Sequence, residues 1–117
     1  MPIYWAISYY MAPGKGTEYQ KWLTSDEAKK IFAQFEKETG FKYLNTYMAL
    51  MGFGDYDVED WFVAPDWSAF DKTRSSKAFD ELTVKTWDLC DQNRPMKSRV
   101  MRTVQEVRIS EKPAKKK

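Results

Sequence analysis

The side chains able to do chemistry in this chain are carboxylates, phenols and amides, because the sequence has no histidine and one cysteine. Without histidine, Ser-His-Asp and Cys-His catalytic arrangements are excluded, and so are metal sites built on imidazole. Cys90 follows the helical spacing of apolar neighbours and has no base in view, so we expect a buried structural thiol. We therefore expect neither a metal ion nor a cofactor.

Asp60 is the acid best placed to act as a catalytic group, because it lies inside an expected strand while its acidic neighbours lie in an expected turn. With a two-residue turn, the strand face that carries Asp60 also carries Asn45 and Tyr47, and a one-residue slip would exchange the faces. A carboxylate in an apolar pocket has a raised pKa and can act as a general acid or base without histidine. Asp60 or Tyr47 would then move the proton, and Asn45 would orient the substrate or stabilise an oxyanion. The structural alternative is that Asn45 and Tyr47 bond to each other's neighbours.

Aromatic side chains are abundant, with five Trp, seven Tyr and seven Phe among 117 residues. Such rings can wall a pocket by stacking on a ligand, but they can also fill an ordinary core. Our candidates for substrate binding are Tyr9, Trp22, Trp61 and Trp87. Arg99 and Arg102 fall on opposite faces of the last expected strand. Arg102 could bind a carboxylate or phenolate, and the alternative is pairing with acids of a partner subunit.

The hydrophobic pattern predicts four strands and two main helical regions. A Thr-x-x-Glu capping box at Thr24–Glu27 allows the first helix to restart there, and Gly40 is a natural end for it. Asp66 or Ser68 can cap a short helical turn. We expect strands at 3–11, 43–53, 58–64 and 99–109, a helical region at 19–40, and a helix from Ser75 or Ser76 through Cys90. The order β-α-β-β-α-β predicts an α+β, ferredoxin-like topology with one antiparallel sheet and the helices on one face.

Both faces of the expected strands carry large apolar side chains, although the helices can cover only one face. In the register above, the apolar face is formed by Leu44, Met48, Leu50, Trp61 and Val63. A monomer would leave an apolar sheet face in water, which is unusual for a soluble protein. We therefore expect a two-fold homodimer that packs sheet on sheet.

Two short segments resemble those of the dimeric α+β barrel superfamily. Tyr9–Lys15, followed by Glu18 and Tyr19, is similar to its strand, Pro-Gly-Lys turn and aromatic helix start, and Asp66–Phe70 is similar to its entry into the second helix. With the element order of residues 3–109, the chain resembles antibiotic-biosynthesis monooxygenase-like and NIPSNAP-like domains. The resemblance implies a cavity between sheet and helices that binds a small hydrophobic or aromatic molecule. Some members oxidise such molecules without a cofactor and others isomerise them, whereas haem-using members need a histidine that this chain lacks.

The expected function is therefore binding of a small aromatic or hydrophobic molecule, with cofactor-independent oxidation or isomerisation as the reaction if the protein is an enzyme. One alternative is a non-catalytic dimeric carrier or interaction module. A second is an RNA-binding domain, because residues 52–56 faintly resemble an aromatic RNP signature. Residues 1–110 are nearly neutral, since four of the lysines lie in residues 111–117, so we expect no nucleic acid partner.

The length fits a single domain, for which we expect residues 1–110, followed by a basic solvated tail at 111–117. No stretch of the sequence is long and apolar enough to span a bilayer. The first residues lack the basic and apolar regions of a secretory signal. We therefore expect a cytoplasmic protein without a membrane partner.

Overall fold

The computed structural model of the chain describes residues 2–49 and 56–102. The elements follow the expected order, with each helical region divided into two helices. They are β1 (Ile3–Tyr9), α1 (Gly16–Leu23), α2 (Asp26–Thr39), β2 (Lys42–Met48), β3 (Val58–Ala64), α3 (Ser68–Thr73), α4 (Lys77–Leu89) and β4 (Lys97–Arg102). None of the helices in the described ranges is long and apolar enough to cross a membrane.

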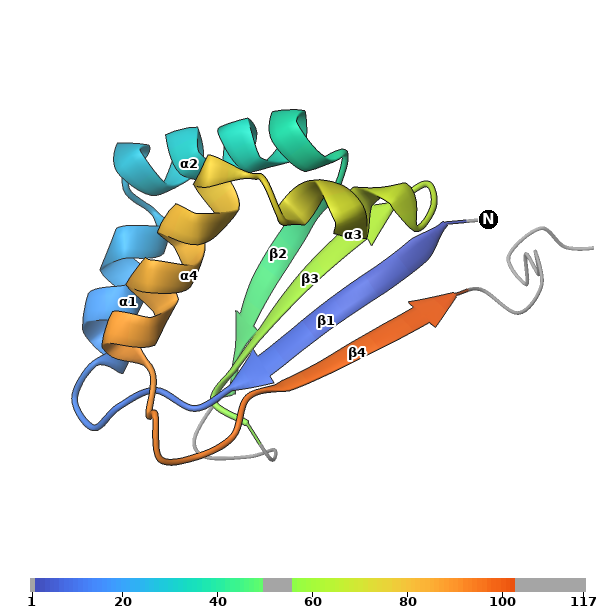
Figure 1. Ribbon diagram of the computed structural model, residues 1–117. Helices are drawn as coiled ribbons and strands as arrows, with labels where there is room; N and C mark the ends of the chain where they lie inside the picture. Colours follow the sequence, from blue (N-terminus) through green and yellow to red (C-terminus); the bar gives the residue numbers. More distant parts are fainter. Residues whose placement is uncertain (1, 50–55, 103–117) are drawn as a thin grey trace, which may run out of the picture.

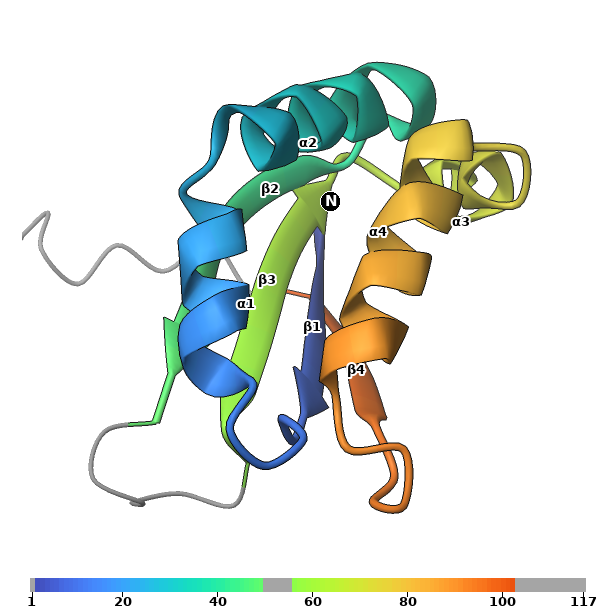
Figure 2. The same ribbon diagram turned by 90° about the vertical axis from the view of Figure 1, so that its left-hand side faces the viewer.

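The four strands form one sheet in the order β2-β3-β1-β4, and every neighbouring pair is antiparallel. All four helices lie on the same face of this sheet (Figures 1 and 2). The α+β prediction is therefore confirmed. We call the face toward the helices the inner face and the other the outer face.

The helix boundaries follow from caps that are visible in the sequence. Ser25 begins α2 by accepting a hydrogen bond from the Ala28 backbone N–H, so the cap lies one residue after the predicted Thr24. The Thr24 hydroxyl instead donates to the Lys21 carbonyl, so Thr24 lies at the end of α1. Gly40 ends α2 in a left-handed conformation with φ of 87°, as predicted, because glycine adopts this region without a steric penalty.

Helix α4 is held at both of its ends. At its start, the predicted cap Ser76 accepts from the Phe79 N–H, and its hydroxyl donates to Glu38 Oε1 over 2.7 Å. The same Glu38 oxygen accepts from the Ala78 N–H of α4. At its other end, the chain pairs with the segment after β1 through an isolated bridge between Met11 and Cys90. The two ends of α4 are therefore bound to α2 and to the end of β1.

The register between β2 and β3 differs from the prediction. Thr46 lies opposite Asp60, and Tyr47 lies opposite Glu59. The register shifts between Tyr43 and Asn45, as it does at a β-bulge. The prediction assumed a two-residue turn, but Met48 pairs with Val58, so residues 49–57 connect the paired ends. The register therefore differs from the predicted one by an odd number of residues, which exchanges the two faces. The predicted grouping of Asp60 with Asn45 and Tyr47 is therefore wrong, and both residues lie on the outer face.

Other expected boundaries are shorter in the structure or fall outside it. Strand β1 ends at Tyr9 instead of Met11, although Met11 still forms its bridge to Cys90. Residues 50–55 lie outside the described residues. They include the end of the second expected strand and most of the RNP-like segment. Residues 103–109 of the last expected strand and the basic tail also lie outside the described residues.

The core lies between the inner face and the helices and consists mainly of stacked and tilted rings. Phe35 of α2 packs edge-on against Phe62 of β3, with ring centroids 5.3 Å apart, and in parallel against Phe79 of α4 at 5.9 Å. Cys90 is 6% exposed, and burial raises the pKa of its thiol. The predicted burial of this thiol is confirmed.

Candidate functional site

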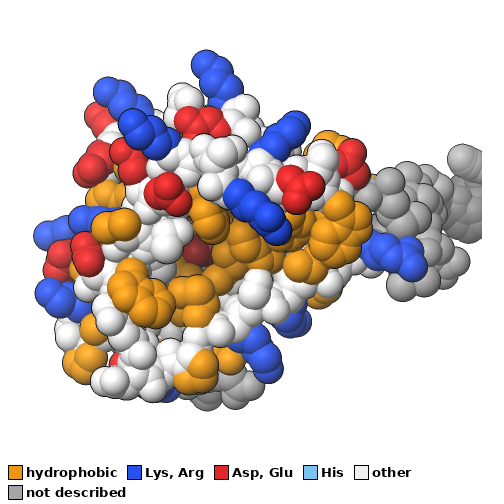
Figure 3. Space-filling model, in the orientation of Figure 1, with side chains coloured by type: hydrophobic (Ala, Val, Ile, Leu, Met, Phe, Trp, Pro, Cys, Tyr) orange, Lys and Arg blue, Asp and Glu red, His pale blue; other side chains and the backbone are white. Residues whose placement is uncertain are grey.

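A cavity of about 300 Å³ lies between the inner face of the sheet and the helices. Its walls are mostly apolar, and Figure 3 shows a hydrophobic hollow between helices and sheet with an acidic side chain inside it. Asp60 is the acidic residue among those that line the cavity. The apolar walls include Trp5, Ile7, Phe32, Phe62, Phe79 and Leu82. Ligand pockets have this composition, with apolar walls and a few placed polar groups.

Asp60 is 8% exposed, and hydroxyl groups bond both of its carboxyl oxygens. The Tyr9 phenol donates to Oδ2 over 2.8 Å, and the Thr46 hydroxyl donates to Oδ1 over 2.6 Å. Burial raises the pKa of Asp60 to about 6, although these two hydrogen bonds lower it and the nearby charge of Glu59 raises it. Asp60 can therefore gain or lose a proton close to neutral pH.

The hydrogen bonds continue beyond Asp60 in both directions. On one side, the Tyr9 and Tyr19 hydroxyls lie 2.7 Å apart, which joins β1 to α1. On the other side, the Tyr43 hydroxyl bonds to the Thr46 hydroxyl within β2. Burial, together with the charge of Asp60, raises the phenol pKa of both Tyr9 and Tyr19, so these phenols stay neutral at physiological pH. The set is a continuous chain of protonatable groups centred on one carboxyl group.

Three of the predicted site residues line this cavity. Asp60 and Tyr9 belong to the hydrogen-bonded chain, and both are buried. Trp87 of α4 lies at the rim with 49% of its surface exposed, beside Met96, which is 40% exposed. The structure therefore brings together an acid, a phenol and an exposed ring from three different elements.

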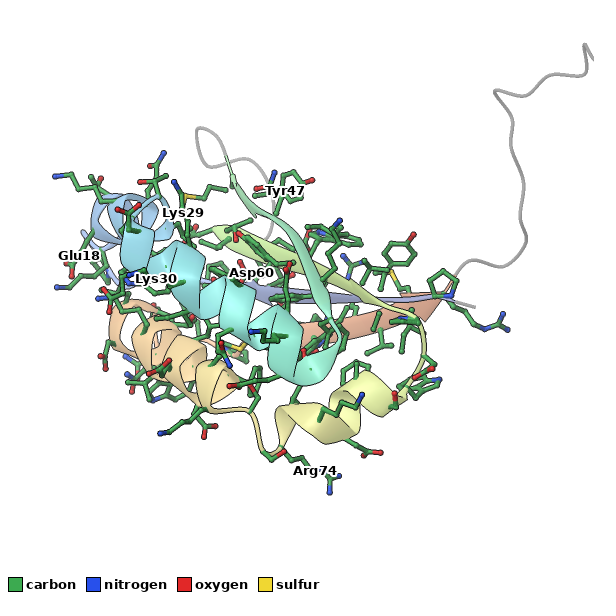
Figure 4. All side chains as sticks on the ribbon, turned by 90° about the horizontal axis from the view of Figure 1, so that it is seen from above. Glu18, Lys29, Lys30, Tyr47, Asp60 and Arg74 are labelled. Carbon is green, nitrogen blue, oxygen red and sulfur yellow. The ribbon has the colours of Figure 1, made fainter. Side chains whose placement is uncertain are left out.

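Three other predicted residues lie on the outer face, away from the cavity. Asn45 is exposed, and its side-chain oxygen accepts from the Thr46 backbone N–H. Tyr47 is 56% exposed, and Figure 4 shows it outside the space between sheet and helices that contains Asp60. Trp61 donates its indole N–H to Glu59 Oε1 over 3.0 Å. Asn45 and Tyr47 cannot act on a ligand held beside Asp60 within the same chain.

Trp22 and Arg102 are also separate from the cavity. Trp22 packs in parallel on Tyr19, with ring centroids 6.0 Å apart, and Lys85 lies over the Trp22 ring at 5.7 Å. Arg102 is the last residue of β4, opposite Ile3, and is exposed. Arg99 lies opposite Ala6 on the same strand, three positions earlier, so the predicted separation of Arg99 and Arg102 onto opposite faces is confirmed.

The outer face has a polar cluster of its own, centred on Glu59. Ser8 donates to Glu59 Oε2 over 2.7 Å, and Arg99 contacts the same oxygen at 3.1 Å. These hydrogen bonds and the charge of Arg99 lower the pKa of Glu59, against the opposing effect of its partial burial. Glu59 and its partners form a structural ion-pair cluster. Within the described ranges, no group of acids or thiols is suited to hold a metal ion.

Sequence reasoning misses Tyr19 and Thr46 as members of the site. The helical spacing places Tyr19 on the apolar stripe of a helix, and its position one turn before Trp22 gives no sign that its hydroxyl faces Tyr9. Thr46 can be found from its pairing with Asp60, but only once the pairing of Met48 with Val58 has fixed the register.

Comparison with solved structures places the chain among ferredoxin-like proteins. An uncharacterised NIPSNAP-like domain protein from Burkholderia xenovorans is 11% identical, with a TM-score of 0.64 over 92% of this chain and 89% of that one. The cofactor-independent oxygenase SnoaB from Streptomyces nogalater is 11% identical, with a TM-score of 0.59 over 91% and 96%. A dimeric protein of unknown function with a ferredoxin-like fold from Bacteroides fragilis is 2% identical, with a TM-score of 0.63 over 87% and 96%.

The chain has the ferredoxin-like fold. The resemblance in fold to monooxygenase-like and NIPSNAP-like domains, predicted from short segments of the sequence, is confirmed. No protein-family model matches the sequence, and no curated protein matches it. At these low identities the comparison supports the fold and leaves the site to be argued from its own geometry.

Proposed function

We propose that the inner cavity binds a small hydroxylated aromatic molecule and that Asp60 is the general base that removes its proton. The observation that carries this proposal is a buried carboxyl group, with a pKa raised to about 6, among the aromatic walls of a cavity. A base with a pKa near the working pH combines the correct protonation state with a useful driving force for proton transfer. The exposed ring of Trp87 at the rim would stack on the bound molecule.

Removal of a proton from such a molecule leads to two reactions that need no cofactor. In an isomerisation, the proton taken from the hydroxyl is returned to a carbon of the resulting anion, which gives the keto form. In an oxygenation, the electron-rich anion reacts directly with O₂: a ring carbon forms a bond to oxygen, and loss of one water leaves a quinone-type carbonyl. The substrate supplies all four electrons that reduce O₂: one oxygen atom stays in the new carbonyl, and the other leaves as that water. The fold shared with the cofactor-independent oxygenase SnoaB supports the second reaction.

The proposal is tested by oxygen consumption with a panel of naphthols and dihydroxynaphthalenes, followed by product analysis by mass spectrometry and NMR. We expect Asp60→Asn to reduce turnover by about 10²-fold or more, as the loss of a general base does. Asp71→Asn is the matched control, because it removes the same charge from an exposed position on α3. If Asp60→Asn turns over a substrate as fast as wild type, the assignment of the base is wrong.

A homodimer through the outer face completes this proposal. Tyr4, Trp61, Val63 and Met101 are only half-buried on that face, and no helix of the described chain covers it. Pairing of two outer faces would remove these side chains from water. The Bacteroides fragilis protein with a ferredoxin-like fold is dimeric, which supports a dimer without specifying its interface. Light scattering at micromolar concentration should give twice the mass of the chain, and a monomer mass would contradict the dimer.

A non-catalytic ligand carrier is the second candidate function. It is favoured by the hydrogen bonds of Asp60, because both carboxyl oxygens already have hydroxyl partners and are satisfied without a ligand. A carrier would bind naphthols without converting them. Neither the wild type nor Asp60→Asn would then show turnover, and the substitution would change affinity alone. The same panel therefore distinguishes the two functions.

A further inference from the structure

The hydrogen-bonded chain around Asp60 has a direction that depends on the charge of Asp60. An ionised carboxylate only accepts hydrogen bonds, so Tyr9 and Thr46 must both donate to it. Each hydroxyl has one hydrogen, and these two hydrogens are then in use. The contact between Tyr9 and Tyr19 therefore needs the hydrogen of Tyr19, and the contact between Thr46 and Tyr43 needs that of Tyr43. With Asp60 ionised, every hydroxyl hydrogen points toward it.

Hydroxyl groups extend from Asp60 in two arms, one through Tyr9 to Tyr19 and the other through Thr46 to Tyr43. Protonation of Asp60 reverses the hydrogen bonds of one arm. If the new O–H of Asp60 donates to Tyr9, the Tyr9 hydrogen turns to Tyr19, and the Tyr19 hydrogen is released from the chain. Thr86 of α4 lines the cavity with Tyr19 and lowers the pKa of its phenol, and the Thr86 hydroxyl can rotate to donate or accept, so it does not block this change. The Tyr19 hydroxyl, at the end of this arm, therefore changes from a hydrogen-bond acceptor into a donor toward the cavity.

Only the arm through Tyr9 and Tyr19 reaches the cavity. Tyr9, Tyr19 and Thr86 line it, whereas Tyr43 and Thr46 are absent from its lining among the described residues. Reversal of the Tyr43 arm would release a hydrogen away from any ligand. The polarity of the cavity is thus set through two phenols and one carboxyl group.

We propose that the cavity accepts hydroxyl-bearing aromatic molecules when Asp60 is ionised and carbonyl-bearing ones when Asp60 is protonated, with Tyr19 as the group that contacts the ligand oxygen. The ligand hydroxyl donates to Tyr19 in the first state, and Tyr19 donates to the ligand carbonyl in the second. This inference rests on the proposed function for the cavity as the ligand site, and it specifies the substrate as a phenol or enol and the product as a ketone or quinone.

The same arrangement gives the route of the proton. The ligand O–H bond breaks as its proton passes to Tyr19, the Tyr19 proton passes to Tyr9, and the Tyr9 proton forms the new O–H bond of Asp60. No electron leaves the ligand in this step, and one negative charge moves from Asp60 to the ligand oxygen. Tyr19 then holds a hydrogen directed at that oxygen, so the state that receives the anion also stabilises it.

Few other titratable groups face Asp60, so its protonation is the event that changes the cavity. Tyr9 on β1, Tyr19 on α1 and Tyr43 on β2 face it, and each has a pKa raised by burial. Glu59 precedes it on β3 and acts through its charge alone. From α2, α4 and β4 the cavity is lined by apolar and aromatic side chains and by the hydroxyls of Thr83, Thr86 and Ser98, and none of these titrates near neutral pH.

The test compares two probes of similar size that do not titrate near pH 6. 2-Naphthol carries a hydroxyl donor, and 2-acetylnaphthalene carries only a carbonyl acceptor. Calorimetric affinities are measured for both between about pH 5 and pH 8. We expect the preference for 2-naphthol over 2-acetylnaphthalene to rise by about tenfold over this range, which corresponds to one hydrogen bond gained or lost.

Three variants assign the effect to the correct arm. In Asp60→Asn and Tyr19→Phe, the preference should no longer depend on pH. Tyr43→Phe is the matched control, since the same atom is removed from the arm that does not reach the cavity, and its preference should still rise with pH. Equal pH dependence in Tyr19→Phe and wild type would overturn the inference, as would its loss in Tyr43→Phe.

The wild-type protein alone separates this inference from the function on which it rests. If both probes bind and their ratio stays constant with pH, the cavity is a ligand site but Asp60 does not set its polarity. If neither probe binds at any pH, the proposed function and the inference both fail. Because this comparison needs no substitution, it remains decisive even if Tyr19→Phe does not fold.

Discussion

Asp60 and Glu59 are neighbours on β3, but they point to opposite faces of the sheet and have pKa values shifted in opposite directions. Both carboxylates accept two or more hydrogen bonds from side chains. Burial nevertheless raises the pKa of Asp60, whereas hydrogen bonds and Arg99 lower that of Glu59, which keeps access to water. Hydrogen bonds from neutral hydroxyls therefore do not replace the hydration of a buried carboxylate, and desolvation decides the chemistry of the inner face.

The largest effect expected from this difference is in the pH dependence of stability. The folded state binds the proton of Asp60 more tightly than the unfolded state, because its pKa is about 6 instead of 3.8. The free energy of unfolding contributed by this group is therefore highest at low pH and falls as pH rises through this window, by about 3 kcal/mol. Urea unfolding of wild type and Asp60→Asn between about pH 4 and pH 7.5 measures it as the difference between the two proteins. A constant difference would show that Asp60 titrates like an exposed acid.

A smaller effect is expected from removal of one hydroxyl on the inner face. Tyr9→Phe leaves Asp60 Oδ2 without its buried donor, which should cost about 1 to 3 kcal/mol of stability near pH 7.5. The pKa of Asp60 should rise further, because the lost hydrogen bond lowers it in the wild type. Urea unfolding and an NMR titration of Asp60 measure the two changes. Tyr4→Phe on the outer face is the matched control and should change stability by no more than about 0.5 kcal/mol.

The smallest effect is expected on the outer face. Glu59→Gln removes the ion pair with Arg99, which is partly exposed, so the loss should stay below about 1 kcal/mol. The pH dependence of stability that Glu59 contributes is opposite to that of Asp60. Because folding lowers the pKa of Glu59, its contribution is present above the pKa of the unfolded state and is lost as pH falls through the pKa of the folded state. Added salt should weaken this contribution while it leaves the pH dependence of Asp60 largely intact. A loss as large as that of Tyr9→Phe would contradict the contrast between the two faces.

The sequence was sufficient for the order of elements and for several boundaries, because local signals determine them. Ser76 before α4 and the glycine at position 40 mark helix ends whose backbone groups need those residue types. The apolar residues of Val58–Ala64 were enough to place Asp60 inside a strand, where the structure shows it buried. These features depend on a few consecutive residues.

The partners of Asp60 could not be predicted, because they depend on the length of the connection between β2 and β3, and a change by one residue exchanges the faces. Because Met48 pairs with Val58, Thr46 lies opposite Asp60, and Asn45 and Tyr47 lie on the other face. The contact with Tyr19 depends on how α1 packs across the sheet, and that is a property of the whole core. The acid of the candidate site was therefore visible in the sequence, but the groups that set its chemistry were not.

The attachment of α4 at both ends determines how a molecule can reach the cavity. Glu38 holds its first turn, and backbone hydrogen bonds from Ala12 and Asp91 hold its last. Movement of the whole helix would break contacts at one end or the other, so the width of the passage is left to the exposed side chains Trp87 and Met96 at the rim. Exposed side chains change rotamer within picoseconds to nanoseconds, far faster than helices move. Exchange of the ligand should therefore be limited by its affinity and not by the opening of the protein.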